Sequence, residues 1–149
     1  MYDEILVATD ASEFAAAAAD HGIELARLAG GRVHAVYVIE TRTAYDNAIV
    51  DPDSVRANLR EDGREALRSI EESANEAGVE TTTSIREGIP AEVLLEYASE
   101  HDIDVLVAGA RGKSDFKRAL LGSTTERLLD EAVAPVFVVT ERSWSEQQT

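Results

Sequence analysis

A segment of glycines and basic side chains is the part of the sequence best suited to chemistry. Gly109 and Gly112 come at the end of a short apolar run. Gly122 and Ser123 follow Gly112 after nine further residues, which gives the spacing G-x2-G-x9-G-[ST]. Glycines at the end of a strand let the backbone approach a ligand closely. A Gly-Ser pair that opens a helix presents N–H groups and a hydroxyl to an anion. The spacing therefore predicts a phosphate site.

The charge of this segment favours the same interpretation. Between Gly109 and Gly122 the chain carries four basic side chains and one acid, a local charge of +3, whereas the whole chain carries −15. The basic residues include both lysines of the sequence and are Arg111, Lys113, Lys117 and Arg118. An isolated basic segment on an acidic chain attracts anions. The alternative, an ordinary solvated loop, stays open.

Length and composition indicate one globular domain. With 149 residues, of which 44% are hydrophobic, the chain can bury a core, so its high charge does not indicate disorder. No apolar run is long enough to cross a membrane and the N-terminus lacks a signal-peptide pattern, so we expect a cytoplasmic protein. The absence of cysteine excludes disulfides, thiol catalysis and cysteine-bound metals.

The acidic balance restricts the partners. The chain has 29 Asp and Glu against 14 Lys and Arg. Such a surface repels nucleic acids and anionic membranes, so we expect neither as a partner. Many carboxylates with few lysines are typical of a halophilic protein, in which salt screens the mutual repulsion. The alternative is an acidic protein without salt adaptation.

Strand and helix patterns alternate along the chain. Apolar and β-branched runs predict strands at residues 4–8, 32–39, 79–86, 104–108 and 136–139. Helical periodicity predicts helices at residues 12–28, 55–77, 91–100 and 123–132. Residues 41–54 show no clear period and are interpreted as a loop. The domain is expected to span residues 1–141, with a polar tail at 142–149.

This alternation is typical of an α/β fold, an open five-stranded parallel sheet with helices on both faces. The threonines of the third strand favour an exposed or edge position. Ligands bind such sheets at the carboxyl ends of the strands. Asp10 follows the first strand and the glycine segment follows the fourth, so we expect them to share one crevice. Asp10 is then a candidate ligand for a ribose hydroxyl or a phosphate-bound Mg²⁺. The alternative is a carboxylate that only stabilises the turn.

Together these residues resemble the universal stress protein family over nearly the whole chain. The resemblance rests on the segments Ile5–Ser12, Val36–Ile39, Gly88–Pro90, Gly109–Ser123 and Ala134–Val139. It implies a Rossmann-like fold of the adenine nucleotide alpha hydrolase-like type. It also implies that ATP is bound, with Mg²⁺, because family members with the G-x2-G-x9-G-[ST] segment bind ATP and members without it generally do not.

The resemblance also implies which residues form the site. Ala8, Thr9 and Asp10 would contact adenosine, and Val38 would meet the adenine through its backbone. The ribose and phosphates would be lined by Gly109, Arg111 and Gly112. The phosphates would be held at a helix N-terminus by Gly122, Ser123, Thr124 and Thr125. The family often has proline in place of Ala8 and serine or histidine in place of Arg111, so the resemblance does not settle the role of Arg111.

The last strand, Val136–Val139, indicates a second partner. It is apolar and only a polar tail follows it, and an uncovered apolar edge strand promotes aggregation unless it is paired. The resemblance implies a homodimer in which this strand pairs across a two-fold axis.

Other site patterns are absent. A Walker A motif fails because Val107 stands where the motif needs glycine. The three histidines lie at no metal-ligand spacing, so each is interpreted as a surface or packing residue, and no metal site is predicted in the protein alone. No general base or arginine finger is recognisable, so no catalytic residue is predicted and any ATP hydrolysis should be slow.

The sequence therefore favours a nucleotide-responsive regulatory or protective module of the cytoplasmic stress response. Two alternatives stay open. One is an ATP-using enzyme of the same fold, an ATP pyrophosphatase or an adenylyl-transfer enzyme. The other is an interaction module that does not use a nucleotide.

Overall fold

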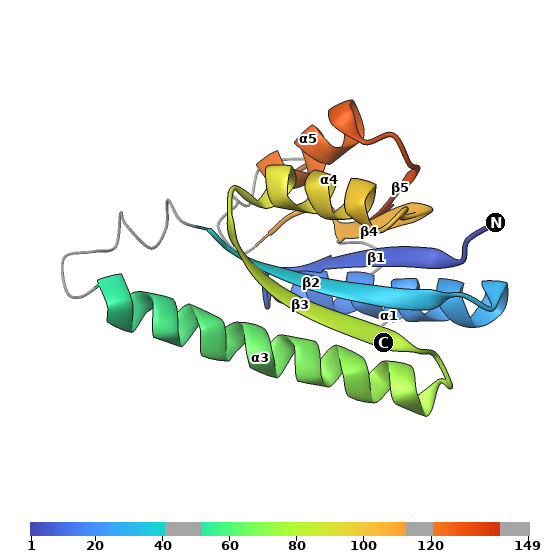
Figure 1. Cartoon of the computed structure of the whole chain (residues 1–149), viewed down its shortest axis with the longest axis horizontal. Coiled ribbons are helices and arrows are strands. Elements are labelled where there is room, and N and C mark those ends of the chain that lie inside the picture. Colours follow the sequence, from blue (N-terminus) through green and yellow to red (C-terminus); the bar gives the residue numbers. More distant parts are fainter. Residues whose placement is uncertain (41–51, 113–120, 141–149) are drawn as a thin grey trace.

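The computed structural model of the chain describes residues 1–40, 52–112 and 121–140 (Figure 1). In chain order the elements are β1 (Glu4–Thr9), α1 (Glu13–Ala29), β2 (Arg32–Glu40), α3 (Pro52–Glu76), β3 (Thr81–Gly88), α4 (Pro90–Glu100), β4 (Val105–Gly109), α5 (Ser123–Glu131) and β5 (Val136–Val139). All strands pair in parallel in one sheet of order β3-β2-β1-β4-β5. The predicted fold class is confirmed, and the third strand lies at an edge as expected.

Two elements differ from the sequence prediction by more than one residue at an end. The prediction of a loop was wrong at residues 52–54, which form the first turn of α3. Proline fits at the start of a helix because the N–H group that it lacks would have no helical partner there. β3 spans Thr81–Gly88 rather than residues 79–86, because the Val79 N–H donates to the Ala74 carbonyl, at 2.8 Å, in the turn that closes α3. Residues 41–51 of the predicted loop and the predicted tail 142–149 lie outside the described residues.

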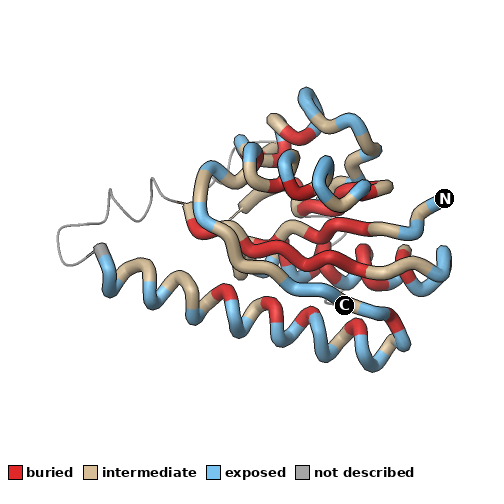
Figure 2. Tube along the Cα trace, in the orientation of Figure 1, coloured by how far each residue is buried: buried red, intermediate tan, exposed pale blue. Residues whose placement is uncertain are grey.

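Helices cover both faces of the sheet. The side chains of α1 and α3 pack on one face with Ile5 and Val7, and those of α4 and α5 pack on the other with Leu6. Figure 2 shows the buried residues concentrated along the central strands. Because β1 is covered on both faces, its successive side chains from Ile5 to Ala8 are all apolar, which explains the unbroken run that indicated this strand. None of the helices in the described ranges combines the length and apolar character needed to cross a membrane.

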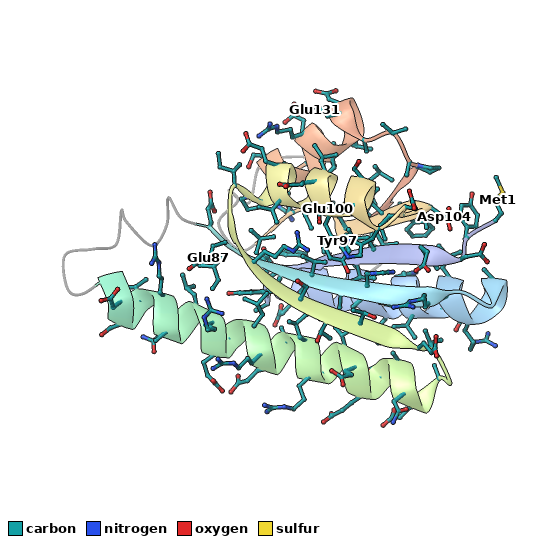
Figure 3. The ribbon with its side chains drawn as sticks, viewed as in Figure 1. Met1, Glu87, Tyr97, Glu100, Asp104 and Glu131 are labelled. Carbon is teal, nitrogen blue, oxygen red and sulfur yellow. The ribbon has the colours of Figure 1, made fainter. Side chains whose placement is uncertain are left out.

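A buried polar cluster joins α4 to the amino-terminal parts of β1 and β2. His34 of β2 is buried, and its Nδ1 lies 2.7 Å from the hydroxyl of Tyr97, which α4 contributes (Figure 3). The Nε2 atom of His34 lies 2.5 Å from the carboxylate of Glu4. The Tyr97 ring also stacks on His101, and the Arg86 guanidinium lies 4.7 Å from the centre of the Tyr97 ring. Both ring nitrogens of His34 are therefore satisfied, as a buried polar group requires.

The ring of Tyr37 lies in a notch of α3 at Gly63. Tyr37, on β2, is only 3% exposed. A Cβ built on Gly63 would lie 2.3 Å from the Cδ1 atom of that ring. An enclosed aromatic ring cannot move aside in a close-packed core. The absence of a side chain at Gly63 therefore sets how closely α3 approaches β2.

Replacing Gly63 by alanine tests this packing. In an exposed helix interior, Gly→Ala raises stability by ~1 kcal/mol. For Gly63→Ala we expect the opposite sign, a loss of about 1–3 kcal/mol in the free energy of unfolding, because the methyl group overlaps the Tyr37 ring. Urea unfolding measures the difference. The control Asn58→Ala, at an exposed position of α3, should be as stable as the wild type or slightly more so. A Gly63→Ala protein more stable than the wild type would contradict the packing.

The ionisation of Tyr37 gives a second test. Burial, with smaller contributions from the negative charges of Asp62 and Asp10, raises the pKa of Tyr37 from 10.0 to about 12. The folded protein thus holds this proton more tightly than the unfolded chain does. The resulting stabilisation is complete below pH 10 and is lost as the pH rises to 12, by at most ~3 kcal/mol. Unfolding of Tyr37→Phe should lack this component, so the variant should lose less stability than the wild type over this range. Equal losses would refute the assignment.

Candidate functional site

A cavity of about 360 Å³ lies at the carboxyl ends of β1, β2 and β4, beside the first turns of α4 and α5. The chain passes from β1 to α1 on one face of the sheet and from β4 toward α5 on the other. This divergence is the switch point at which open α/β sheets bind ligands. A larger hollow of about 810 Å³ lies between α3 and β3, but it contains none of the residues predicted to bind a ligand.

The structure brings together nearly all of the predicted site residues. Those that line the cavity are Ala8, Thr9, Asp10, Val38, Gly109, Arg111, Gly112, Ser123, Thr124 and Thr125. Gly122 is buried and is not among the lining residues. Lys113, Lys117 and Arg118 lie outside the described residues. Segments distant in the sequence therefore meet at one place, as expected for Asp10 and the glycine segment.

The turn between β1 and α1 places Asp10 on the cavity wall. Its Oδ1 atom accepts a hydrogen bond from the Ser12 N–H at 2.9 Å, and Thr9 Oγ1 accepts one from the Ala11 N–H at 3.1 Å. Ala11 has a φ of 68°, which a residue with a side chain rarely adopts. Asx and ST turns of this kind stabilise such a conformation. Asp10 therefore shapes the turn, as the alternative interpretation proposed, and also lines the cavity.

Gly109, at the end of β4, lies against the first turn of α1. A Cβ on Gly109 would lie 3.0 Å from the carbonyl oxygen of Phe14, so only glycine fits without displacing that turn. Thr125 Oγ1 donates to the Gly109 carbonyl at 2.7 Å, and the Gly122 N–H donates to the Ala110 carbonyl at 2.7 Å. These two bonds hold the N-terminus of α5 beside the end of β4.

The N-terminus of α5 differs from that of α1. Ser12 caps α1 by accepting a hydrogen bond from the Ala15 N–H at 3.2 Å. The N-cap of α5 is Gly122, which provides no side-chain cap, and Ser123 is the first helical residue. Ser123 therefore begins α5, as predicted, and does not cap it. A helix N-terminus carries partial positive charge and N–H groups without helical partners, which suit an anion.

The rest of the lining was not predicted. These additional residues are Ala15, Val36, Tyr37, Glu40, Leu59, Pro90, Leu94 and Ala108. The aliphatic members form an apolar part of the cavity, contributed by α1, β2, α3, α4 and β4. In the sequence Leu59 and Leu94 are ordinary core-facing helix positions, and nothing local separates a cavity wall from the core. Glu40 and Pro90 could have been found, because each lies beside the end of a strand.

The charge of the described lining is mixed. Asp10 and Glu40 are acidic, and Arg111 is the one basic side chain among the described lining residues. The guanidinium carbon of Arg111 lies over the Phe14 ring, 5.4 Å from its centre. The cavity thus combines an apolar wall, two carboxylates, one guanidinium and an N-terminus without a side-chain cap. This combination can hold a molecule with an apolar ring at one end and negative charge at the other.

Comparison with known proteins assigns the chain to a protein family. The model of the universal stress protein family matches residues 1–140. Universal stress protein MJ0531 of Methanocaldococcus jannaschii is 35% identical over 140 residues, which cover 93% of this chain and 82% of that protein. The solved structure of MJ0577 superposes with a TM-score of 0.83 at 29% identity and covers 95% of this chain and 97% of the other.

Two more distant structures carry adenine nucleotides. A universal stress protein solved in complex with cAMP has a TM-score of 0.69 at 23% identity, covering 93% of this chain and 97% of the other. A family protein from Arabidopsis thaliana with AMP bound has a TM-score of 0.67 at 17% identity, covering 93% and 91%. At these identities the likeness concerns the fold alone. The family model and the identity to MJ0531 carry the assignment, and the chain belongs to the universal stress protein family.

Proposed function

We propose that this protein binds ATP, together with Mg²⁺, in the cavity at the carboxyl ends of β1, β2 and β4. It then acts as a nucleotide-responsive regulatory or protective module of the stress response in the cytoplasm. One observation carries the proposal: a single cavity joins a helix N-terminus without a side-chain cap to an apolar wall. A nucleotide needs both, because its phosphates are anionic and its base is a flat, largely apolar ring.

The phosphates are assigned to the α5 end of the cavity. Ser123 and Thr124 line it there, in the first turn of a helix whose dipole favours negative charge. The backbone of Gly109 and Gly112 forms the neighbouring wall, and the absence of a Cβ at Gly112 lets phosphate oxygens approach the chain closely. Arg111 adds a charged donor, and hydrogen bonds to charged groups are about twice as strong as neutral ones.

The adenosine is assigned to the opposite, apolar end. Val38 and Leu94 line the cavity on the face of the sheet that α4 covers, with Pro90 at the start of α4. Aliphatic walls with a few polar groups are typical of nucleotide and cofactor pockets, and 360 Å³ lies within their usual size. Asp10 is suited to the ribose hydroxyls, because a carboxylate accepts hydrogen bonds from them.

The magnesium ion is expected to arrive with the nucleotide. Asp10 and Glu40 offer carboxylate oxygens, which Mg²⁺ prefers. The described residues contain no group of three His, Cys, Asp or Glu side chains able to hold a metal. Phosphate oxygens would therefore complete the coordination, as in most Mg²⁺–nucleotide sites. We propose binding rather than rapid turnover, because the sequence has no recognisable general base or arginine finger for phosphoryl transfer.

A carboxylate at Ser123 separates binding from folding. An acidic residue in the first turn of a helix is favourable for the helix itself, so Ser123→Asp should fold as well as the wild type. In the cavity the same charge repels phosphate, and we expect ATP affinity to fall by at least ~10-fold, about 1.4 kcal/mol. Calorimetric titration measures the affinity and thermal unfolding measures the stability. The control Ser99→Asp, exposed on α4, should bind ATP like the wild type. Equal affinities of Ser123→Asp and the wild type would reject the site.

We also propose that a second copy of the chain pairs with β5. This strand lies at the edge of the sheet. Three large apolar side chains of α5, β5 and the turn between them are exposed: Leu129 (46%), Val133 (104%) and Phe137 (44%). Pairing of β5 with its copy across a two-fold axis would cover this edge and give a closed, self-complementary interface.

Light scattering tests the homodimer. Each copy carries a charge of −15, so molar KCl, which shortens the Debye length to ~3 Å, should favour association. We expect light scattering to show that the wild-type protein is a dimer in high salt. Val133→Asp combined with Phe137→Asp should give a monomer, because both carboxylates would be buried at the interface. The control Leu28→Asp, at an exposed apolar position of α1, should remain dimeric. A monomeric wild type in high salt would contradict the proposal.

A further inference from the structure

We propose that Phe14 is a positioning residue for the phosphate end of the cavity. Its ring holds the guanidinium of Arg111 in place, and the pair makes the protein favour nucleotides with several phosphates over the nucleoside. This inference rests on the proposed nucleotide site and adds to it a residue that does not line the cavity.

The contact is a cation–π interaction. The guanidinium carbon of Arg111 lies 5.4 Å from the centre of the Phe14 ring, within the ~6 Å over which such a pair attracts. Arg111 lines the cavity, whereas Phe14 is not among the lining residues. A phenyl ring has no lone pair that accepts hydrogen bonds. The contact therefore orients the guanidinium without itself using one of its N–H groups, and phosphate oxygens are acceptors that suit such groups.

Phe14 is itself held by the backbone on which the cavity is built. It belongs to the first turn of α1, which Ser12 caps. Its carbonyl oxygen and its Cβ would lie 3.0 and 3.2 Å from a Cβ on Gly109, so α1 and the end of β4 are as close as the chain allows. Phe14, whose ring contacts Arg111, is thus packed against Gly109, which precedes Arg111 by two residues. The position of the guanidinium follows from this packing.

The position of Arg111 matters because the other charged side chains of the described lining repel phosphate. Among the described lining residues, Asp10 and Glu40 carry negative charge and Arg111 alone carries positive charge. An arginine side chain also loses considerable rotamer freedom when a ligand immobilises it. A ring that already orients the side chain in the free protein reduces this loss on binding. The gain is expected for ATP and ADP and not for adenosine, which brings no phosphate.

Calorimetric titration of the full chain with ATP·Mg²⁺ and with adenosine tests the inference. Phe14→Leu keeps an apolar side chain and removes the ring, so ATP affinity should fall about 3-fold to 5-fold while adenosine affinity is unchanged. Phe14→Tyr keeps a ring face and should bind both ligands like the wild type. Arg111→Gln should weaken ATP by ~10-fold or more. In the double variant, Phe14→Leu should add no further loss for ATP, because the ring acts through Arg111.

Other outcomes overturn the inference. If Phe14→Leu weakens ATP and adenosine equally, or weakens ATP by the same factor with and without Arg111, then Phe14 only supports the fold. If Phe14→Tyr loses as much ATP affinity as Phe14→Leu, the face of the aromatic ring does not position Arg111. Phe14→Met takes the place of Phe14→Leu if the leucine protein does not fold, because it is also apolar and lacks a ring. A wild type that binds neither ATP nor adenosine refutes the proposed function itself, whereas a wild type that binds ATP while Phe14→Leu has no effect refutes only the role of Phe14.

Discussion

The close approach of the first turn of α1 to the end of β4 is the contact on which the candidate site depends. Gly109 makes it, since a Cβ there would lie 3.0 Å from the carbonyl oxygen of Phe14. The carbonyl of Gly109 accepts the hydroxyl of Thr125, and this bond brings in the N-terminus of α5. Two helices that leave the sheet on opposite faces are thereby tied to one strand end. Their divergence from this strand end leaves the cavity, and the other features of the site are arranged around it.

The remaining walls are placed by contacts deep in the core. Leu94 of α4 lines the cavity, and Tyr97, one turn further along, is hydrogen-bonded to His34 in the buried cluster. Leu59 of α3 lines the opposite side, and Gly63, one turn further along, receives the ring of Tyr37. Packed interiors transmit such constraints because few voids absorb a displacement. The apolar end of the cavity is thus shaped by residues that a ligand need not touch.

The sequence predicted the fold and most of the polar lining of the cavity, although not Glu40, and it missed most of the apolar lining. Strands buried on both faces read as unbroken apolar runs, and glycines at a strand end mark a close approach; both are local signals. Leu59 and Leu94 were missed because an apolar side chain on an amphipathic helix has the same signature whether it meets the core or an opening in it. The start of α5 at Ser123 was predicted, whereas the absence of a side-chain cap at Gly122 is seen only in the structure.

The central claim is that three separate segments meet to bind one nucleotide. The most direct test is the backbone amide spectrum of the isotopically labelled protein, followed during titration with ATP·Mg²⁺. The account predicts that the largest shifts fall on Asp10, Gly109 and Ser123, which are distant in sequence and share only the cavity. Amides of the hollow between α3 and β3, such as those of Arg68 and Thr83, should stay unchanged. Shifts centred on that hollow, or no shifts at all, would contradict the account.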